Sequence, residues 1–179
     1  MSQATAATLP HARPAGAPAL VSVDADAAVD AGRVVEALHE RVQRQFAAYE
    51  AAEGSHALQY RAVRAIAQVL ATHVTVEDEL LYPAVRARTG RLDGEAERQL
   101  QQDHLLDLLL VELGTMIPAD RGYDAKVHVL MQVFGQHARD AEELVVPELR
   151  RLDVAERQAL GRRLLERAGQ LESRPRKGW

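Results

Sequence analysis

The chain has 179 residues and a formal net charge of -4, and 47% of its residues are apolar while only 4% are aromatic. This length and composition predict one globular domain with a core of mainly Leu, Val and Ala. The chain has no cysteine, which excludes disulfides, thiolate metal sites and iron–sulfur clusters, so any metal must be held by His, Asp or Glu. The acidic balance, with no basic stripe, argues against nucleic acid as a partner.

No segment of the sequence predicts a membrane span or a secretory signal. The longest apolar run, residues 105–111, is interrupted by Asp107 and is far too short to cross a bilayer. The N-terminus lacks a basic region followed by an apolar one. We therefore expect a cytoplasmic protein without membrane contact.

The first 22 residues are rich in Ala, Pro and Gly and show no apolar periodicity, which predicts a disordered tail. Residues 23–172 are expected to form the folded domain, and residues 173–179 a second short tail.

Apolar residues at helical spacing predict four long helices joined by short connections. Pro83 falls near the end of the second helix and is expected to kink or loosen it. Asp153 and Glu156 form a capping-box pattern that opens a fifth helix, ending near Leu171. This order predicts an all-α fold, an antiparallel up-down four-helix bundle with an extra C-terminal helix. The four long helices are expected at about residues 24–53, 56–88, 95–116 and 123–149.

Each of the four long helices carries one histidine on its apolar stripe. A single such histidine is most simply a core residue satisfied by one hydrogen bond. Four buried imidazoles in a Leu- and Val-rich core are costly unless something satisfies them, and a metal ion does so. The four are His39, His73, His104 and His137.

Carboxylates accompany two of these histidines. Glu77 follows His73 by four residues, about 40° further round an ideal helix, so both can reach the same side of the bundle. Glu142 follows His137 by five residues, about 140° round, which is less favourable. Its neighbours Asp140 and Glu143 are rivals for the same role, although a solvated face explains both.

The other three histidines are expected to have no part in such a site. His11 falls in the predicted tail and His56 at the very start of the second helix. His128 precedes the fourth-helix candidate by nine residues, which places it on about the opposite face.

At these residues the sequence resembles the hemerythrin-like family, also called HHE cation-binding domains, over roughly residues 24–172. In that family the site holds two non-haem iron ions bridged by two carboxylates and an oxygen species. The motifs that carry the resemblance are His39, His73-x-x-x-Glu77 before Leu81-Tyr82-Pro83, Asp103-His104, and His137-x-x-x-x-Glu142 before Pro147. The ligands that the resemblance implies are His39, His73, Glu77, His104, His137 and Glu142.

The chain departs from the oxygen-carrying members of the family on the third helix. Those members have a second histidine four residues after the first, where this chain has Leu108. A carboxylate, a water molecule or no ligand could fill this position. The departure favours an open coordination position, with Leu108 lining the pocket, where O2, H2O2 or NO can bind or react. Catalase-like decomposition of peroxide is the specific expectation.

Three other interpretations remain open at this stage. The protein could bind oxygen or iron without turnover, or sense redox state through a partner protein. Two of the histidines could instead hold haem, which would leave Glu77 and Glu142 without a role. A metal-free helical scaffold would leave the buried imidazoles unsatisfied.

Overall fold

The structure, a computed structural model, describes residues 29–88 and 93–173. The tail predicted for residues 1–22 and nearly all of that predicted for 173–179 lie outside this part, so the division into domain and tails stays a prediction. The described residues form α-helices and two short π-helical turns, η1 and η2. They are α1 (Ala31–Glu50), α2 (His56–Val76), η1 (Glu77–Leu81), α3 (Tyr82–Arg88), α4 (Asp93–Gly114), α5 (Tyr123–Asp140), η2 (Ala141–Val145), α6 (Val146–Leu149) and α7 (Val154–Glu172).

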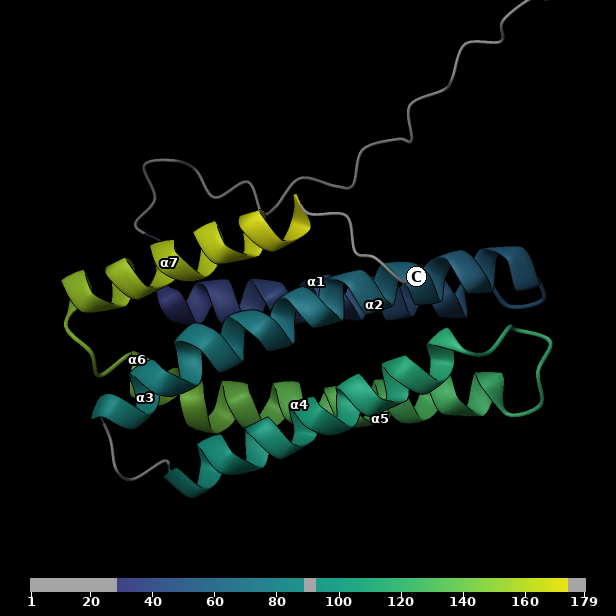
Figure 1. Cartoon of the computed structure of the whole chain (residues 1–179). Helices are drawn as coiled ribbons and strands as arrows, with labels where there is room; N and C mark the ends of the chain where they lie inside the picture. Colours follow the sequence, from purple (N-terminus) through teal and green to yellow (C-terminus); the bar gives the residue numbers. More distant parts are fainter. Residues whose placement is uncertain (1–28, 89–92, 174–179) are drawn as a thin grey trace, which may run out of the picture.

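The helices form an antiparallel bundle with one helix added to its side. In Figure 1, α1 and α2 run side by side, α4 and α5 form the pair below them, and α7 lies across α1 and α2 on the opposite side. The segment α2–η1–α3 is one continuous rod, and so is α5–η2–α6. This arrangement confirms the predicted all-α bundle with an extra C-terminal helix.

The helix ends follow from local sequence. Asp30 caps α1, because its carboxylate accepts hydrogen bonds from the amides of Gly32 and Arg33. Gly54 lies in the turn between α1 and α2, where its φ of 80° is a backbone conformation that favours glycine. Asp153 accepts from the amide of Glu156 at the start of α7, as half of the predicted capping box.

The two π-helical turns each come just before a proline. In η1 the amide of Tyr82 bonds to the carbonyl of Glu77, five residues back, and η2 repeats this pattern. Pro83 and Pro147 follow, and each lacks an N–H and crowds the preceding turn. The widened turns absorb this crowding without ending the rod. The expected loosening of the second helix at Pro83 is thus confirmed as a π turn.

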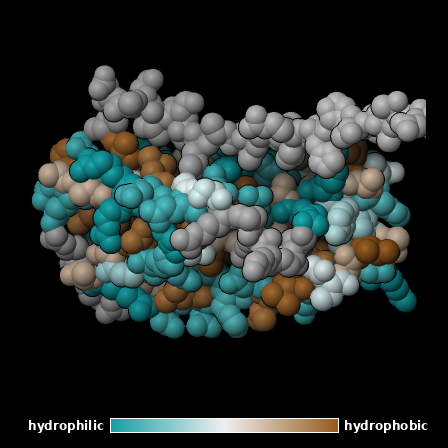
Figure 2. Space-filling view, turned by 45° about the horizontal axis from the view of Figure 1, so that its top comes forward, coloured by the Kyte–Doolittle hydropathy of each residue, from teal (hydrophilic) through white to brown (hydrophobic). Residues whose placement is uncertain are grey.

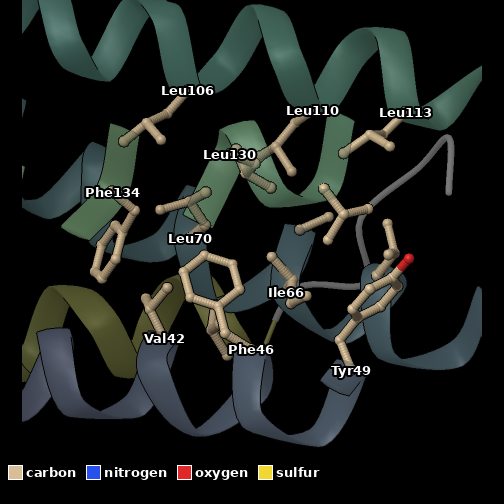
Figure 3. Packing of buried hydrophobic residues seen from close by; sticks show 14 of the residues in the cluster. Val42, Phe46, Tyr49, Ile66, Leu70, Leu106, Leu110, Leu113, Leu130 and Phe134 are labelled. Carbon is tan, nitrogen blue, oxygen red and sulfur yellow. The ribbon is translucent and has the colours of Figure 1, made fainter. Parts of the chain in front are cut away.

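Two apolar clusters fill the bundle, one on each side of a polar layer. Figure 3 shows the first, in which Phe46, Ile66 and Leu130 meet from three helices. The second packs Leu38 and Val145 against Leu164 of α7. Both contain fully buried side chains, and the hydrophobic effect of this burial is the main force that holds the helices together.

Helix α7 is fixed to the bundle by close packing and by ion pairs. Gly161 lies against the backbone of Val29, where a Cβ atom would overlap a carbonyl oxygen, so only glycine allows this approach. The guanidinium of Arg167 donates two hydrogen bonds to Glu79 of η1, at 2.6 and 2.9 Å. Helix α7 therefore supports the turn that follows Glu77.

The surface is mixed in character. Figure 2 shows hydrophobic spots scattered among hydrophilic residues on the face it presents, rather than a continuous apolar belt. Among the described residues, every helix falls short of the length and apolar character needed to cross a bilayer.

Candidate metal centre

Four polar side chains meet in the layer between the two apolar clusters. Each has no solvent exposure, and each offers one ligand atom, all within 4.8 Å of one another. The four are His39 of α1, His73 of α2, Glu77 at the start of η1 and His137 of α5. Three helices thus supply the group, and the spacing of four residues places His73 and Glu77 on one face.

The ring nitrogens gather around the Glu77 carboxylate. The Nε2 atoms of His73 and His137 lie 2.9 Å apart. Glu77 Oε2 lies 3.1 Å from His137 Nε2 and 3.5 Å from His73 Nε2, and Glu77 Oε1 lies 3.6 Å from His39 Nε2. Three imidazole Nε2 atoms and one carboxylate therefore face a common point.

This group leaves polar atoms without hydrogen-bond partners in the interior. His39 Nε2, His73 Nδ1, Glu77 Oε1 and His137 Nδ1 are buried and lack one within the described part of the chain. Burying such atoms unpaired is costly, and most native proteins avoid it. A cation at the common point would satisfy His39 Nε2 and Glu77 Oε1. Imidazole nitrogen with carboxylate oxygen is a donor set that suits iron and zinc. The residues therefore fit a bound metal ion.

The electrostatics of the group keep the carboxylate charged. Burial would raise the pKa of Glu77, but the three histidines outweigh it and hold this pKa well below its usual range. Burial lowers the pKa of His73 to about 3, and His39 and His137 add to the effect. Burial also disfavours charge on His39 and His137, yet contacts with Glu77 raise the pKa of both. A neutral His73 beside an ionised Glu77 is the protonation state that a metal requires.

Phe134 forms one wall of this site. Its ring is fully buried, and its centroid lies 5.5 Å from that of His73 and 5.9 Å from those of His39 and His137. It also belongs to the first apolar cluster, which separates the site from one end of the bundle. The wall excludes water from that side, which strengthens electrostatic interactions inside.

Glu142 reaches the group from the outside. Its Oε1 lies 2.8 Å from Nδ1 of His39, the ring nitrogen turned away from the cluster, and its side chain is 43% exposed. Glu142 is the second residue of η2, directly after the α-helical segment that carries His137. Of its two rivals, Asp140 is engaged with Gln102 and Gln136, and Glu143 is exposed.

Two residues without a predicted role join the group on the side of α4. Asp103 is 1% exposed, and its Oδ1 lies 3.3 Å from Nδ1 of His137. The Tyr82 hydroxyl lies 2.6 Å from Glu77 Oε2 and 3.2 Å from Asp103 Oδ2. Burial, together with Glu77 and Asp78, raises the pKa of Asp103 to about 8, although His137 opposes this. The Tyr82 hydroxyl is the donor in both contacts, so it links the two acidic side chains.

The structure does not bring His104 into the site. Its side chain is exposed on the outer face of α4, while the preceding Asp103 faces inward. Leu108, one turn further on, is 48% exposed. The expectation that Leu108 lines the pocket is therefore wrong, because α4 is turned by about one residue from the predicted orientation. His128, expected to have no role, is exposed and contacts the carbonyl of Asp124.

The chain matches the sequence model of a known protein family. The sequence model of the hemerythrin family, described as the Hemerythrin HHE cation binding domain, matches residues 30–149. This span includes all four residues of the buried group and ends at the last residue of α6, before α7. No curated protein and no solved structure matches the chain.

Proposed function

The chain belongs to the hemerythrin HHE cation-binding family, and we propose that its buried cluster binds non-haem iron and that the protein binds or turns over a small oxidant. O2, H2O2 and NO are the candidate ligands. The observation that carries the proposal is the convergence of three imidazoles and one carboxylate with no solvent exposure. Burying such a group in an apolar core is costly, and a cation that its members share would offset this cost.

The choice of iron rests on the donor set and on the family. Nitrogen and oxygen donors suit iron and zinc alike, and the chain has no thiolate to bias the site toward zinc. When bound, iron would supply the redox chemistry. The residues of the chain hold the ion, keep Glu77 ionised, and exclude bulk water through Phe134 and the surrounding apolar side chains.

Decomposition of hydrogen peroxide is the reaction that we propose to test first. Its basis is family resemblance, since Leu108 is exposed and no longer supports an open position at the metal. The second candidate is oxygen or iron binding without turnover, or redox sensing through a partner. Binding and turnover of a small oxidant both fall within the proposed function. The rate at which the iron-loaded protein consumes hydrogen peroxide distinguishes them.

Haem fits the cluster less well. Two histidines that ligate one haem iron from opposite faces stand about 4 Å apart at their nitrogens, since each bond is about 2.0–2.1 Å long. The Nε2 atoms of His73 and His137 are 2.9 Å apart, and the buried Glu77 occupies the space beside them. We therefore favour non-haem iron over haem.

Reconstitution with ferrous iron under anaerobic conditions tests the proposal. The purified protein should retain iron after desalting, show no Soret band, and consume added peroxide or bind O2 or NO at a rate above that of free iron. The His73→Ala variant should lose most of the iron and all of this reactivity. Retention of zinc alone, or iron that reacts no faster than free iron, would refute the function.

A further inference from the structure

We infer that the cluster is built for one metal ion, with Glu142 and Asp103 holding two of its histidines from outside rather than binding the ion themselves. The inference rests on the proposed function in that the site must bind a metal. It departs from the pair of bridged ions that the family resemblance implies.

The spacing of the donor atoms matches one coordination sphere. Bonds of about 2.0–2.1 Å place neighbouring ligand atoms on a single ion about 3.0 to 3.4 Å apart and opposite ones about 4.2 Å apart. The Nε2 atoms of His73 and His137 are 2.9 Å apart, the Glu77 oxygens lie 3.1, 3.5 and 3.6 Å from the three Nε2 atoms, and one ligand atom from each of the four residues lies within 4.8 Å of the others. Two ions about 3.5–4 Å apart would spread their outermost ligands to about 8 Å.

The contact between Glu142 and His39 explains what the fourth-helix carboxylate does. Glu142 Oε1 lies 2.8 Å from Nδ1 of His39, so the ring donates its Nδ1 proton outward. The lone pair is then left on Nε2, the buried nitrogen that lacks a partner and faces the cluster. A carboxylate in this position fixes the tautomer and orientation of a metal-binding histidine.

Asp103 lies beside the outer nitrogen of His137 without a hydrogen bond to it. Its Oδ1 is 3.3 Å from Nδ1 of His137, while Nε2 of that ring faces the cluster. A small rotation of either side chain would make the contact that Glu142 makes with His39. Tyr82 bridges Asp103 to Glu77 through its hydroxyl. An acidic side chain thus lies at the outer edge of each of two histidines, and the third histidine, His73, is enclosed by the other rings.

The third long helix adds no imidazole to this set. His104 is exposed on α4, and the helix would have to rotate about its axis to bring this side chain to the site. Without it, a second ion would have only oxygen donors among the described residues near the site, such as Asp103, Glu142 and Tyr82, because the three imidazoles are already committed to the first ion. The cluster of His39, His73, Glu77 and His137 is therefore a complete site for one ion.

Metal counting tests the inference directly. Full-length protein reconstituted with excess ferrous iron and desalted should hold about one ion per chain. X-ray absorption should show a nitrogen and oxygen shell without metal–metal scattering, and the oxidised protein should give the EPR signal of isolated high-spin ferric iron. About two ions with metal–metal scattering would overturn the inference and leave the proposed function intact. Absence of bound iron would instead overturn the function.

Two variants separate orientation from ligation. Glu142→Gln and Asp103→Asn should keep about one ion per chain but bind it about 10- to 100-fold more weakly, with a changed absorption edge. Glu143→Gln, an exposed carboxylate one residue further on, is the matched control and should leave affinity unchanged. Loss of one of two ions in Glu142→Gln would mean that Glu142 is a ligand, which contradicts the inference.

Discussion

His73 and His137 are 64 residues apart in the sequence, yet their Nε2 atoms lie 2.9 Å from each other in the core. At that distance one nitrogen can donate only if the other carries a lone pair, so at least one ring is neutral. The pKa of His73, lowered to about 3 first by burial, identifies it as that ring. A metal ion between the two nitrogens would remove the need for a proton there.

Removing one imidazole should weaken metal binding strongly. His73→Ala deletes a fully buried donor and leaves a cavity beside the two imidazoles and one carboxylate that remain, so the ion loses one bond and is released more easily. We expect iron content after desalting to fall to near background. His128→Ala, whose ring is half-exposed on the same helix as His137, is the control and should retain the full content. Equal iron in both variants would place the metal elsewhere.

Metal binding should stabilise the fold. A ligand that binds only the native state at about 100 times its dissociation constant adds about 2.7 kcal/mol to the free energy of unfolding. Differential scanning calorimetry of metal-free and iron-loaded protein, at matched anaerobic conditions, measures this as a higher melting temperature. Acid should reduce the difference, because protons compete for His39 and His137, whose pKa values are raised. Superimposable melting curves would argue against a buried site.

Phe134 should matter to both stability and metal retention. Phe134→Ala leaves a cavity against three histidine rings and should lower the free energy of unfolding by about 3–5 kcal/mol. Phe134→Leu refills most of the apolar volume and should cost less. Urea unfolding of the metal-free variants gives the energies, and chelator-driven release gives the rate of metal loss. Faster release from Phe134→Ala than from Phe134→Leu is expected, since water then enters beside the ion. Identical release rates would show that this wall does not limit access.

The stability of the metal-free protein should depend on Asp103 above acid pH. Burial raises its pKa to about 8 in the folded chain, whereas an unfolded aspartate titrates at about 3.9. The folded state therefore holds one more proton between these values, and its stability falls as pH rises through that window. Asp103→Asn keeps a neutral group and should remove this part of the loss.

The comparison is a pair of urea series from pH 4 to 8 on metal-free parent and variant. The gap in unfolding free energy between them should widen in favour of Asp103→Asn as pH rises. Asp107→Asn, at an exposed position one turn away, serves as the control and should follow the parent. Parallel curves for all three proteins would mean that Asp103 is ionised in the folded chain.

The sequence predicts most of the fold because its helices are long, strongly periodic and separated by short loops. Each of the helices that carry His39, His73, Glu77 and His137 has a single apolar face. These residues lie on those faces, so packing the faces together in a bundle brings the four side chains together. Helix α4 differs, because its segment Leu105 to Val111 is apolar almost all the way round. Two faces therefore qualify as the inner one.

The correct face of α4 has a weak signal that favours it. Gln99, Asp103, Leu106, Leu110 and Leu113 recur every three or four residues and are all buried. Gln99 and Asp103 make this stripe less apolar than the face that carries His104 and Leu108. The sequence analysis therefore chose the wrong face as the inner one. Tyr82 could not be assigned a role from sequence, since its position over Glu77 depends on the widened turn η1.

The most direct test of a metal held by these four side chains is anomalous diffraction at the iron edge from crystals of the iron-loaded protein. The account predicts one anomalous peak between the Nε2 atoms of His39, His73 and His137 and the carboxylate of Glu77. Iron-loaded crystals that diffract well but show no anomalous peak at this cluster would contradict it.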